Sequence, residues 1–301
     1  MAFSIRNAAR AVAAATIVFG LPAVAGPLAD KVGHTDPTKY RDLSAVHAGA
    51  GKMAFEQLLG ADALSTNLIF VHRGVIQPKS GIGQHFHNQC EEMFVILDGE
   101  AQFTIDGRTS TLTGPAAVPD RAGHAHAIYN PGDRPLQWLN INVGLTKDYD
   151  NFDLGDTRVG APLDAVPQFI SARLDRALLR PVQAMDGGQG TVMYRRALGP
   201  TVFSTTWSFI DHLLMPPGTT VGTAGKPGMS EVYYVVGGEG EITVAGETVH
   251  IREGDAIPVD VGQLRAVKQV GVAPLEFMVI GVAKDFAAKA AFAAAATRRP
   301  R

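Results

Sequence analysis

Residues 84–100 read QHFHNQCEEMFVILDGE and carry the strongest structural signal in the chain. His85 and His87 are two positions apart, and on a β-strand such side chains point to the same face, about 6.5–7 Å apart along the chain. The apolar run that follows ends in Asp98-Gly99, a pair that tolerates the positive φ of a tight hairpin turn. The stretch therefore predicts antiparallel strands, one of which presents two imidazoles to one face.

Similar short runs lie on both sides of this stretch. Apolar residues cluster at 67–76, 101–105, 109–112 and 136–143, separated by Gly, Pro and a second Asp-Gly pair at 106–107. Strands of about 4–8 residues, with a turn signal about every 8–12 residues, are typical of an antiparallel barrel or sandwich. An all-β domain is expected.

This β-rich unit occurs twice, because turn residues recur at a constant offset of 139 positions. Turn glycines and prolines coincide since both copies need the same bends. The matched pairs are Glu92 and Glu231, Gly99 and Gly238, Glu100 and Glu239, Gly107 and Gly246, Pro119 and Pro258, Gly123 and Gly262, and Pro135 and Pro274. The chain is therefore expected to form two tandem antiparallel β-barrels, at 45–145 and 190–283.

The segments outside the two barrels are expected to be partly helical. In the connector at 146–189, Asp164 is positioned to cap a short helix that runs through Phe169, Leu174 and Leu178. The Ala-rich tail at 284–301 predicts a helix with a basic, solvated end.

The first 25 residues indicate an export signal. Arg6 and Arg10 precede an apolar stretch that ends in Ala23-Val24-Ala25, which is the pattern of a secretory signal peptide. We expect cleavage after Ala25 and a secreted protein, periplasmic in a two-membrane bacterium; an uncleaved N-terminal anchor is the alternative. The apolar stretch is shorter than the ~20 residues of a membrane span, so no membrane association is expected after cleavage.

Composition excludes several functional classes. The net charge is −2, no long basic run occurs in the body of the chain, and aromatic residues make up 7%, so nucleic acid is not an expected partner. A single cysteine, Cys90, excludes an internal disulfide framework and a Cys-rich metal site. We expect that thiol to be a passive buried side chain.

The histidine-rich segments predict a metal site. His85 and His87 can converge on one ion, Glu92 opens the next strand, and a further imidazole is available in the segment at 119–126. Three neutral imidazoles and one carboxylate suit a divalent first-row metal and leave coordination positions open for water or substrate. Glu91 is the rival carboxylate, but alternation along the strand favours Glu92.

These spacings resemble the two motifs of the cupin superfamily. The first motif reads HxH, three or four residues, E, six residues, G, and His85, His87, Glu92 and Gly99 match it. The second ends G, two residues, H, three residues, N, and Gly123, His126 and Asn130 match it. The resemblance implies double-stranded β-helix (jelly-roll) barrels, a bicupin, and the metal ligands His85, His87, Glu92 and His126.

Two departures from the family pattern concern loops. Lys79 stands where the family has a glycine six residues before the first histidine, and the P-x-G of the second motif is stretched to Pro119-x-x-x-Gly123. Both lie in turns, so they alter loop shape and leave the four implied ligands in place.

The second copy has lost most of these ligands. At the offset of 139, Ala224, Lys226 and Arg265 replace the three histidines, while Glu231 replaces Glu92. A divalent ion would lack nitrogen ligands there, so we expect one metal per chain, which can be Fe, Mn, Ni, Cu, Co or Zn. Glu231 is expected to pair with Lys226 or Arg265, and the alternative is an anion-binding pocket built from these two cations.

Candidate pocket residues follow from strand alternation. Phe94 and Ile96 share a face with Glu92, and Trp138 and Asn140 share a face of the strand at 136–143. Two histidines outside the ligand set, His72 and His124, are the catalytic candidates. His124 is equally compatible with an exposed rim.

Three functions are compatible with this site. The resemblance favours an exported metal-dependent dioxygenase acting on a small enol or phenolic substrate, because some flavonol and ring-cleaving bicupins keep metal in the first barrel only. The first alternative is a non-redox lyase, isomerase or decarboxylase, since a bound dication stabilises a developing enolate. The second is a non-catalytic small-molecule-binding cupin. A homo-oligomer is compatible with each of these.

Overall fold

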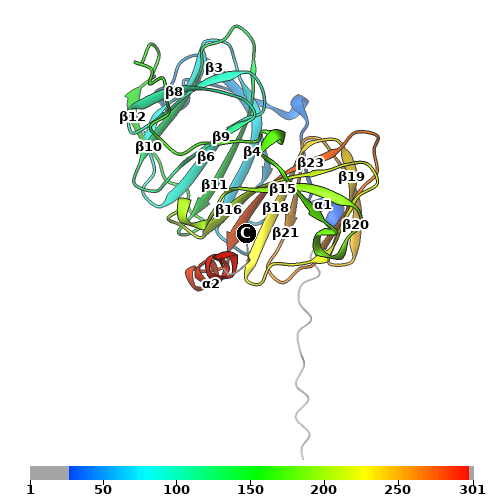
Figure 1. Cartoon of the computed structure of the whole chain (residues 1–301). Coiled ribbons are helices and arrows are strands. Elements are labelled where there is room, and N and C mark those ends of the chain that lie inside the picture. Colours follow the sequence, from blue (N-terminus) through cyan, green and yellow to red (C-terminus); the bar gives the residue numbers. More distant parts are fainter. Residues whose placement is uncertain (1–26, 298–301) are drawn as a thin grey trace, which may run out of the picture.

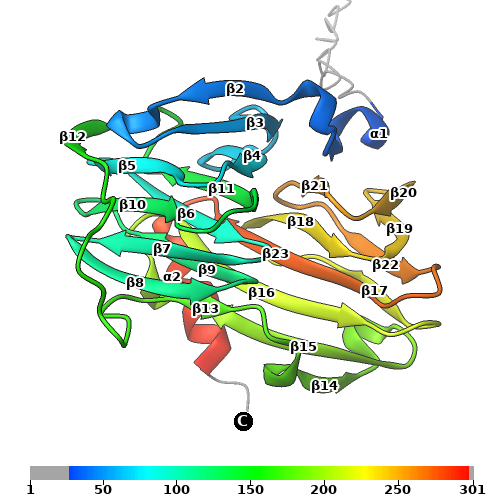
Figure 2. The ribbon, with the colours of Figure 1, turned by 90° about the horizontal axis from the view of Figure 1, so that it is seen from above.

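A computed structural model gives the fold of residues 27–297, and the predicted signal peptide lies outside these described residues (Figure 1). The expected all-β architecture is confirmed, because four antiparallel sheets form two barrels that lie side by side (Figure 2). Within the described residues, no helix is long and apolar enough to cross a membrane.

Each barrel consists of a seven-stranded sheet that faces a smaller one. In the first barrel the large sheet has the order β13 (Ala172–Arg173), β9 (Ala116–Asp120), β6 (Cys90–Ile96), β11 (Leu136–Gly144), β4 (Leu68–Ile76), β3 (Lys52–Leu59) and β2 (Arg41–Ser44). The five-stranded sheet has the order β12 (Phe152–Asp156), β5 (Ser80–Phe86), β10 (Ala125–Asn130), β7 (Glu100–Ile105) and β8 (Arg108–Thr113).

The second barrel repeats this plan. Its large sheet has the order β1 (Gly33–His34), β21 (Asp255–Val259), β18 (Met229–Gly237), β23 (Leu275–Ala283), β16 (Trp207–Met215), β15 (Thr191–Leu198) and β14 (Arg180–Gln183). The four-stranded sheet has the order β17 (Thr220–Ala224), β22 (Arg265–Gln269), β19 (Glu239–Val244) and β20 (Glu247–Arg252).

The strands of the first barrel and one of its two expected hairpin turns agree with the sequence analysis. Asp98-Gly99 forms no hairpin, because it links β6 to β7 in the opposite sheet. Each of the expected runs forms a strand with boundaries within two residues of those predicted. Asp106 and Gly107 both have positive φ, +48° and +77°, as a tight two-residue hairpin turn between β7 and β8 requires.

The internal repeat is longer than the sequence motifs indicate. The offset of 139 positions already relates β2 to β14 and β3 to β15, so both barrels begin earlier than expected. It also relates β1 to β13, and these two short strands exchange barrels: β1 pairs with β21 of the second barrel, whereas β13 pairs with β9 of the first. The exchange ties the two halves of the chain together.

The connector differs from the expected helix. It carries a 3-10 turn at Arg176–Leu178, but Asp175 caps that turn, and no helix begins at Asp164. Asp164 instead accepts two hydrogen bonds from the Arg108 guanidinium, at 2.7 and 2.6 Å, which holds this segment in an extended conformation beside β8. The other 3-10 turns are Pro37–Lys39, Val46–Ala48, Met185–Gly187 and Pro200–Val202.

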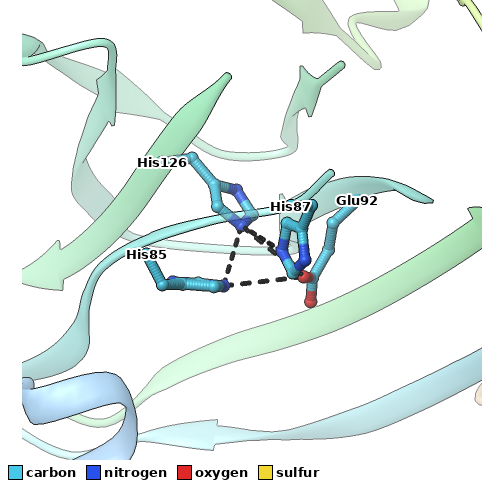
Figure 3. A group of neighbouring side chains, drawn as sticks. All are labelled: His85, His87, Glu92 and His126. Carbon is cyan, nitrogen blue, oxygen red and sulfur yellow. Dashed lines mark hydrogen bonds and ion pairs between the residues drawn. The ribbon is translucent and has the colours of Figure 1, made fainter. Parts of the chain in front are cut away.

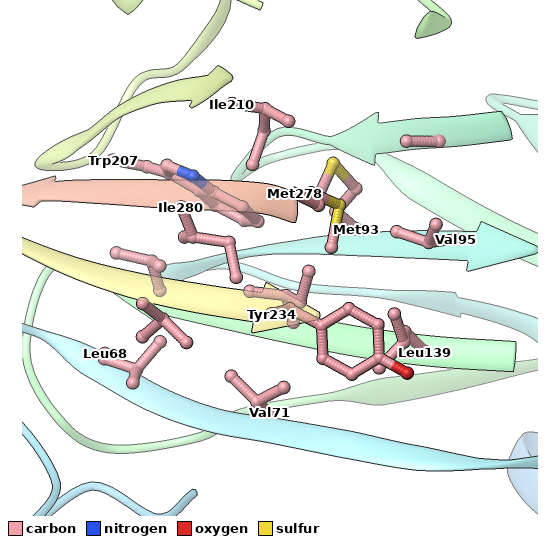
Figure 4. Close-up of a cluster of buried hydrophobic side chains, with 14 of the residues drawn as sticks. Leu68, Val71, Met93, Val95, Leu139, Trp207, Ile210, Tyr234, Met278 and Ile280 are labelled. Carbon is pink, nitrogen blue, oxygen red and sulfur yellow. The ribbon is translucent and has the colours of Figure 1, made fainter. Parts of the chain in front are cut away.

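The outer faces of the two large sheets pack against each other and form the largest core. Leu68, Val71, Met93 and Leu139 from the first barrel meet Trp207, Ile210, Tyr234, Met278 and Ile280 from the second (Figure 4). Burial of each such side chain contributes about 1.5–3 kcal/mol. Along β6, Met93 and Val95 face this interface while Phe94 and Ile96 face the barrel interior. Both faces of the strand are buried, which explains its continuous apolar run.

Two short helices complete the fold. Helix α1 (Leu28–Lys31) packs Leu28 into the core of the second barrel. The expected C-terminal helix is present as α2 (Phe286–Thr297) and packs on the second barrel, with Phe292 stacked on Phe209 at 5.2 Å between ring centroids. Lys289 also donates hydrogen bonds to the carbonyls of Phe203 and Thr205.

Candidate metal centre

Three strands of the first barrel bring the four predicted ligands together. His85 lies on β5 and faces His126 on β10 in the register of the small sheet, and His87 follows directly after β5. Glu92 lies on β6 in the opposite sheet, and its side chain crosses the barrel interior to meet them (Figure 3). The side chains of all four are at most 2% exposed.

The ligand atoms converge on one small volume. The Nε2 atom of His126 lies 3.0 Å from that of His85 and 3.2 Å from that of His87. Glu92 Oε2 lies 2.6 Å from His87 Nε2, 3.5 Å from His126 Nε2 and 3.6 Å from His85 Nε2. One ligand atom from each residue falls within 4.8 Å of every other, which is the spacing of a single ion site.

Neighbouring groups hold the imidazoles and the carboxylate in the orientation that metal binding needs. The Nδ1 atoms of His85 and His87 lie 2.9 and 2.6 Å from the carbonyl oxygens of Gly83 and Asp150. Because a carbonyl only accepts, both Nδ1 atoms carry a proton, and the Nε2 atoms that point into the centre are the ones available to bind a metal. Asn140 donates a hydrogen bond to Glu92 Oε1.

The second carboxylate oxygen of Glu92 indicates that this centre suits a metal ion. Glu92 Oε2 is buried and makes no hydrogen bond of normal geometry, although three Nε2 atoms surround it. A buried carboxylate oxygen without a hydrogen bond is costly unless a cation is close. Three neutral imidazoles and one carboxylate form a site suitable for one divalent metal ion.

The electrostatics of the cluster also favour a cation. Burial, reinforced by the neighbouring His85 imidazole, lowers the pKa of His126 to about 3. Burial also disfavours the charged form of His87, but the Glu92 carboxylate outweighs it and raises the pKa of His87 to about 11. In spite of burial, the charge of His87 and the polar interactions with all three histidines hold the pKa of Glu92 well below its usual range. Without a metal, the proton on His87 supplies the positive charge beside this ionised carboxylate, and a bound dication would displace that proton and leave three neutral imidazoles.

The rival carboxylate, Glu91, points away from this centre. It accepts hydrogen bonds from the backbone amides of Ser204 and Thr205, at 2.6 and 2.9 Å, and from the Thr205 hydroxyl. Glu91 therefore joins the two barrels, while its neighbour Glu92 faces the interior.

Two further residues of the sequence analysis, His124 and Cys90, lie outside the ligand set. His124 is about one-third exposed and pairs with Asp106 at 2.6 Å, so it lies on the rim. Cys90 is buried as predicted, but its Sγ atom lies 3.6 Å from His87 Nδ1 and 3.4 Å from Asp150 Oδ1. His87, Cys90 and Asp150 do not form a separate metal site, because His87 Nδ1 donates its proton to the Asp150 carbonyl oxygen and has no lone pair for an ion.

The predicted pocket residues all lie on the interior side of the first barrel. Phe94 stacks on the ring of His126 at 4.3 Å, and Trp138 lies 5.9 Å from Phe94. Ile96 belongs to the same interior cluster. His72 stacks on Phe70 at 3.9 Å, and burial lowers its pKa to about 4, so it is neutral near pH 7. The roles of these residues toward a substrate stay predictions.

Sequence reasoning missed a polar group beside the centre. His47 lies in the 3-10 turn Val46–Ala48 and stacks on His85 at 3.9 Å. Its Nδ1 lies 2.6 Å from Asp153 Oδ1, and its Nε2 lies 3.4 Å from the Tyr149 hydroxyl. The Tyr149 ring is 5.4 Å from that of His87. The only sequence signal was the internal repeat, in which His47 is equivalent to Asp186 at the offset of 139 positions.

A buried carboxyl was also missed. Asp120 lies opposite Glu92 in the register of β9 and β6, and neither of its oxygens has a hydrogen bond. Burial raises the pKa of Asp120 to about 8. It is therefore largely protonated near pH 7 and adds little negative charge to the centre.

The second barrel holds an ion pair at the corresponding place. Lys226 donates a hydrogen bond to Glu231, and this is one of the two pairings that the sequence analysis expected. Arg265 pairs instead with Asp186 at 2.8 Å and donates to the Tyr233 hydroxyl. Among residues 27–297, the groups with metal-binding geometry both lie in the first barrel.

The fold and the site define a class of protein: two jelly-roll barrels in one chain, with a three-histidine, one-carboxylate metal centre in the first. The sequence model of the cupin domain matches residues 72–142 and 212–281, one region in each barrel. The chain is therefore a bicupin of the cupin superfamily.

Curated relatives match parts of the chain. The oxalate-binding protein of Thermotoga maritima is 29% identical over 99 residues, which is 33% of this chain and 82% of that protein. A mannose-1-phosphate guanylyltransferase of Escherichia coli (strain K12) is 28% identical over 81 residues, which is 27% of this chain but only 17% of that enzyme.

Solved structures share the two-barrel arrangement. The oxalate decarboxylase of Bacillus subtilis aligns with a TM-score of 0.59 at 19% identity, over 83% of this chain and 75% of that one. The oxalate decarboxylase of Lactobacillus farciminis aligns with a TM-score of 0.59 at 15% identity, over 84% and 86%. At these identities the likeness shows the fold alone.

Proposed function

We propose that this protein is an exported, metal-dependent enzyme that binds a small chelating oxyanion, such as oxalate or a 2-oxo acid, and removes a carboxylate from it without net oxidation. The observation that carries the proposal is the convergence of three Nε2 atoms on Glu92 Oε2. A dication held by a single carboxylate keeps a net positive charge, which favours oxygen chelates.

The relatives support a carboxylate ligand. One is named an oxalate-binding protein, and the structures with the same fold include oxalate decarboxylases, for one of which Mn(II) centres are described. Manganese is accordingly the metal to test first. In the decarboxylation proposed here, the bond to the leaving carboxylate breaks, carbon dioxide departs, and a proton adds to the carbon that retains the electron pair.

The metal, when bound, supplies positive charge that stabilises this developing negative charge. The chain's own residues hold and orient the reacting groups. His85, His87, Glu92 and His126 are the proposed ligands, and Asn140 fixes the carboxylate. These five residues set the position of the ion in the barrel.

The polar group beside the centre can handle the proton. Asp153 holds the Nδ1 proton of His47, which leaves His47 Nε2 able to accept a proton at the face of His85. The Tyr149 hydroxyl lies 3.4 Å from that atom. We assign His47 and Tyr149 as the groups that bind the substrate oxyanion and carry the proton, in place of His72 and His124.

Dioxygenase chemistry on a phenolic substrate is the second candidate. Phe70, His72 and Tyr149 form an aromatic wall, with Tyr149 5.5 Å from Phe70. Such a wall would stack a planar ring. This reading requires a redox-active metal.

The test measures turnover and oxygen together. Manganese-loaded protein is incubated with oxalate and with 2-oxo acids, and carbon dioxide release and oxygen uptake are recorded. The proposal expects carbon dioxide without net oxygen uptake, lost in His126→Ala. Stoichiometric oxygen uptake with phenols or enols would favour the dioxygenase, and saturable oxalate binding without turnover would favour a binding protein.

Export is part of the proposal and has its own test. The basic, apolar and A-x-A pattern at 1–25 supports it. The secreted or periplasmic fraction of expressing cells should contain a mature chain whose first residue is Gly26. A full-length chain confined to the cytoplasm would contradict it.

A further inference from the structure

We propose that the second barrel binds a small organic carboxylate in the cavity that stands where the first barrel has its metal centre. This inference does not depend on the reaction proposed for the first barrel. The cavity measures about 720 Å³, within the range of small-molecule sites of about 300–1,000 Å³. Its lining includes Ala224, Lys226 and Arg265, the counterparts of the three histidine ligands.

The second barrel has more space at this place than the first. Ala224 replaces the imidazole of His85 by a single methyl group, and the second barrel has room where the first has stacked rings. In the first barrel, His85 is packed between the ring of His47 at 3.9 Å and the ring of His126 at 4.4 Å. The counterpart of His47 is Asp186, whose side chain is turned to Arg265.

The polar groups of the cavity offer hydrogen-bond donors to an anion. Three cations line the cavity, and each already has a carboxylate partner: Arg196 with Asp211, Lys226 with Glu231, and Arg265 with Asp186. These pairs fix the cations in place, and donors remain. Lys226 has three N–H groups and makes one hydrogen bond, and Arg196 Nη1 has no partner among the described residues.

The remaining donors select an anion with oxygen atoms. Tyr233 accepts a hydrogen bond from Arg265 Nε at 2.5 Å, which leaves its own hydroxyl proton free to donate. Ammonium, guanidinium and phenol donors together match a carboxylate. In the first barrel a metal would be the electrophile that receives an oxyanion; in the second, Lys226 takes that place.

Most of the remaining cavity lining is apolar. Val221, Leu213, Val279 and Phe292 complete the wall, and Phe292 comes from α2. The Arg196 guanidinium lies 4.7 Å from the ring centroids of both Phe209 and Phe292, which holds it rigid. A ligand with an apolar or aromatic body and one carboxylate therefore fits better than a small inorganic anion.

The test uses benzoate as the probe and benzamide as its uncharged counterpart. Titration calorimetry on the metal-loaded full chain should show saturable benzoate binding and about tenfold weaker benzamide binding, because the charge-assisted hydrogen bonds are lost. Binding should persist in His126→Ala, which separates it from any binding at the first barrel. Absence of benzoate binding, or equal affinity for benzamide, would overturn the proposal.

Two variants locate the site. Ala224→Phe fills the space left by the missing imidazole without removing a charge, and Lys226→Met removes the central donor. Each should weaken benzoate binding by about tenfold or more while the metal content stays at one per chain. Wild-type benzoate affinity in Ala224→Phe, with the same thermal unfolding midpoint, would contradict the assignment even if Lys226→Met fails to fold.

Discussion

The two barrels share a backbone plan and differ in what surrounds one buried glutamate. Glu92 faces three imidazole nitrogens, whereas Glu231 is neutralised by Lys226. Both carboxylates are 2% exposed, so each needs positive charge beside it. An ammonium group and a metal ion satisfy the same requirement.

The comparison separates the determinants of fold from those of chemistry. Strands β1 to β11 correspond one by one to strands β13 to β23 at the offset of 139 positions, and turn glycines lie at equivalent places. Three substitutions at interior positions exchange a metal centre for a cavity while this framework stays. The barrel therefore does not depend on its site.

Exchanging the equivalent residues His126 and Arg265 for alanine is expected to give the largest difference. His126→Ala removes one of three nitrogen ligands, so the metal content should fall from one per chain to near zero. Arg265→Ala is the matched control and should leave it at one. Elemental analysis of both purified variants decides, and equal metal loss in the two would break the comparison.

Adjacent glutamates provide the second contrast. Glu92→Gln should also abolish metal binding, since a neutral amide replaces the charged ligand. Glu91→Gln should keep the metal but lower the free energy of unfolding by about 2 kcal/mol, because it weakens the hydrogen bonds to Ser204 and Thr205. Denaturant titration and metal analysis measure both effects. Metal retention in Glu92→Gln would reassign the carboxylate ligand.

The ion pair of the second barrel should behave as a replaceable unit. Lys226→Met alone leaves Glu231 buried without its partner and should cost about 3 kcal/mol of unfolding free energy. The double variant Lys226→Met/Glu231→Leu should recover most of that loss. A double variant as unstable as the single one would mean that the pair is required for the fold.

Metal removal should destabilise only through the first barrel. Metal at 100 times its dissociation constant stabilises the folded state by about 2.7 kcal/mol. A chelator should therefore lower the thermal midpoint by roughly 5 °C or more. The shift should disappear in His87→Ala and persist in Lys226→Ala, as differential scanning calorimetry would show. A chelator shift in His87→Ala would place bound metal elsewhere.

The smallest effect is expected at the rim. His124→Ala removes an exposed pair with Asp106, which is worth about 0–1 kcal/mol, and should leave metal content unchanged. Loss of metal in this variant would show that His124 belongs to the centre.

Short-range patterns predicted the strands, and the resemblance to the cupin motifs implied the four ligands that the fold brings together. Alternation along β5 and β6 indicates which side chains face inward, and that information is local, because His85 and His87 are two positions apart and Glu92 lies on the next strand. The rim position of His124 could not be separated from an interior one, because both His124 and His126 lie on the same alternating face.

Features that depend on distant contacts were missed. His47 and Tyr149 reach the centre from segments more than 100 positions apart, and neither lies in a periodic run. The helix expected at Asp164 fails because Arg108, on another strand, binds that carboxylate. The exchanged strands β1 and β13 have two residues each, too few to show a period.

Metal stoichiometry tests the central idea most directly. The purified protein is saturated with Mn(II) or Zn(II) and freed of excess ion. Elemental mass spectrometry then gives the metal concentration, and quantitative amino-acid analysis gives the protein concentration. One ion per chain is the expected result, reduced to none by His85→Ala. Two ions per chain would mean that Lys226 and Arg265 do not exclude metal from the second barrel, and none would mean that three imidazoles around Glu92 are not a metal site.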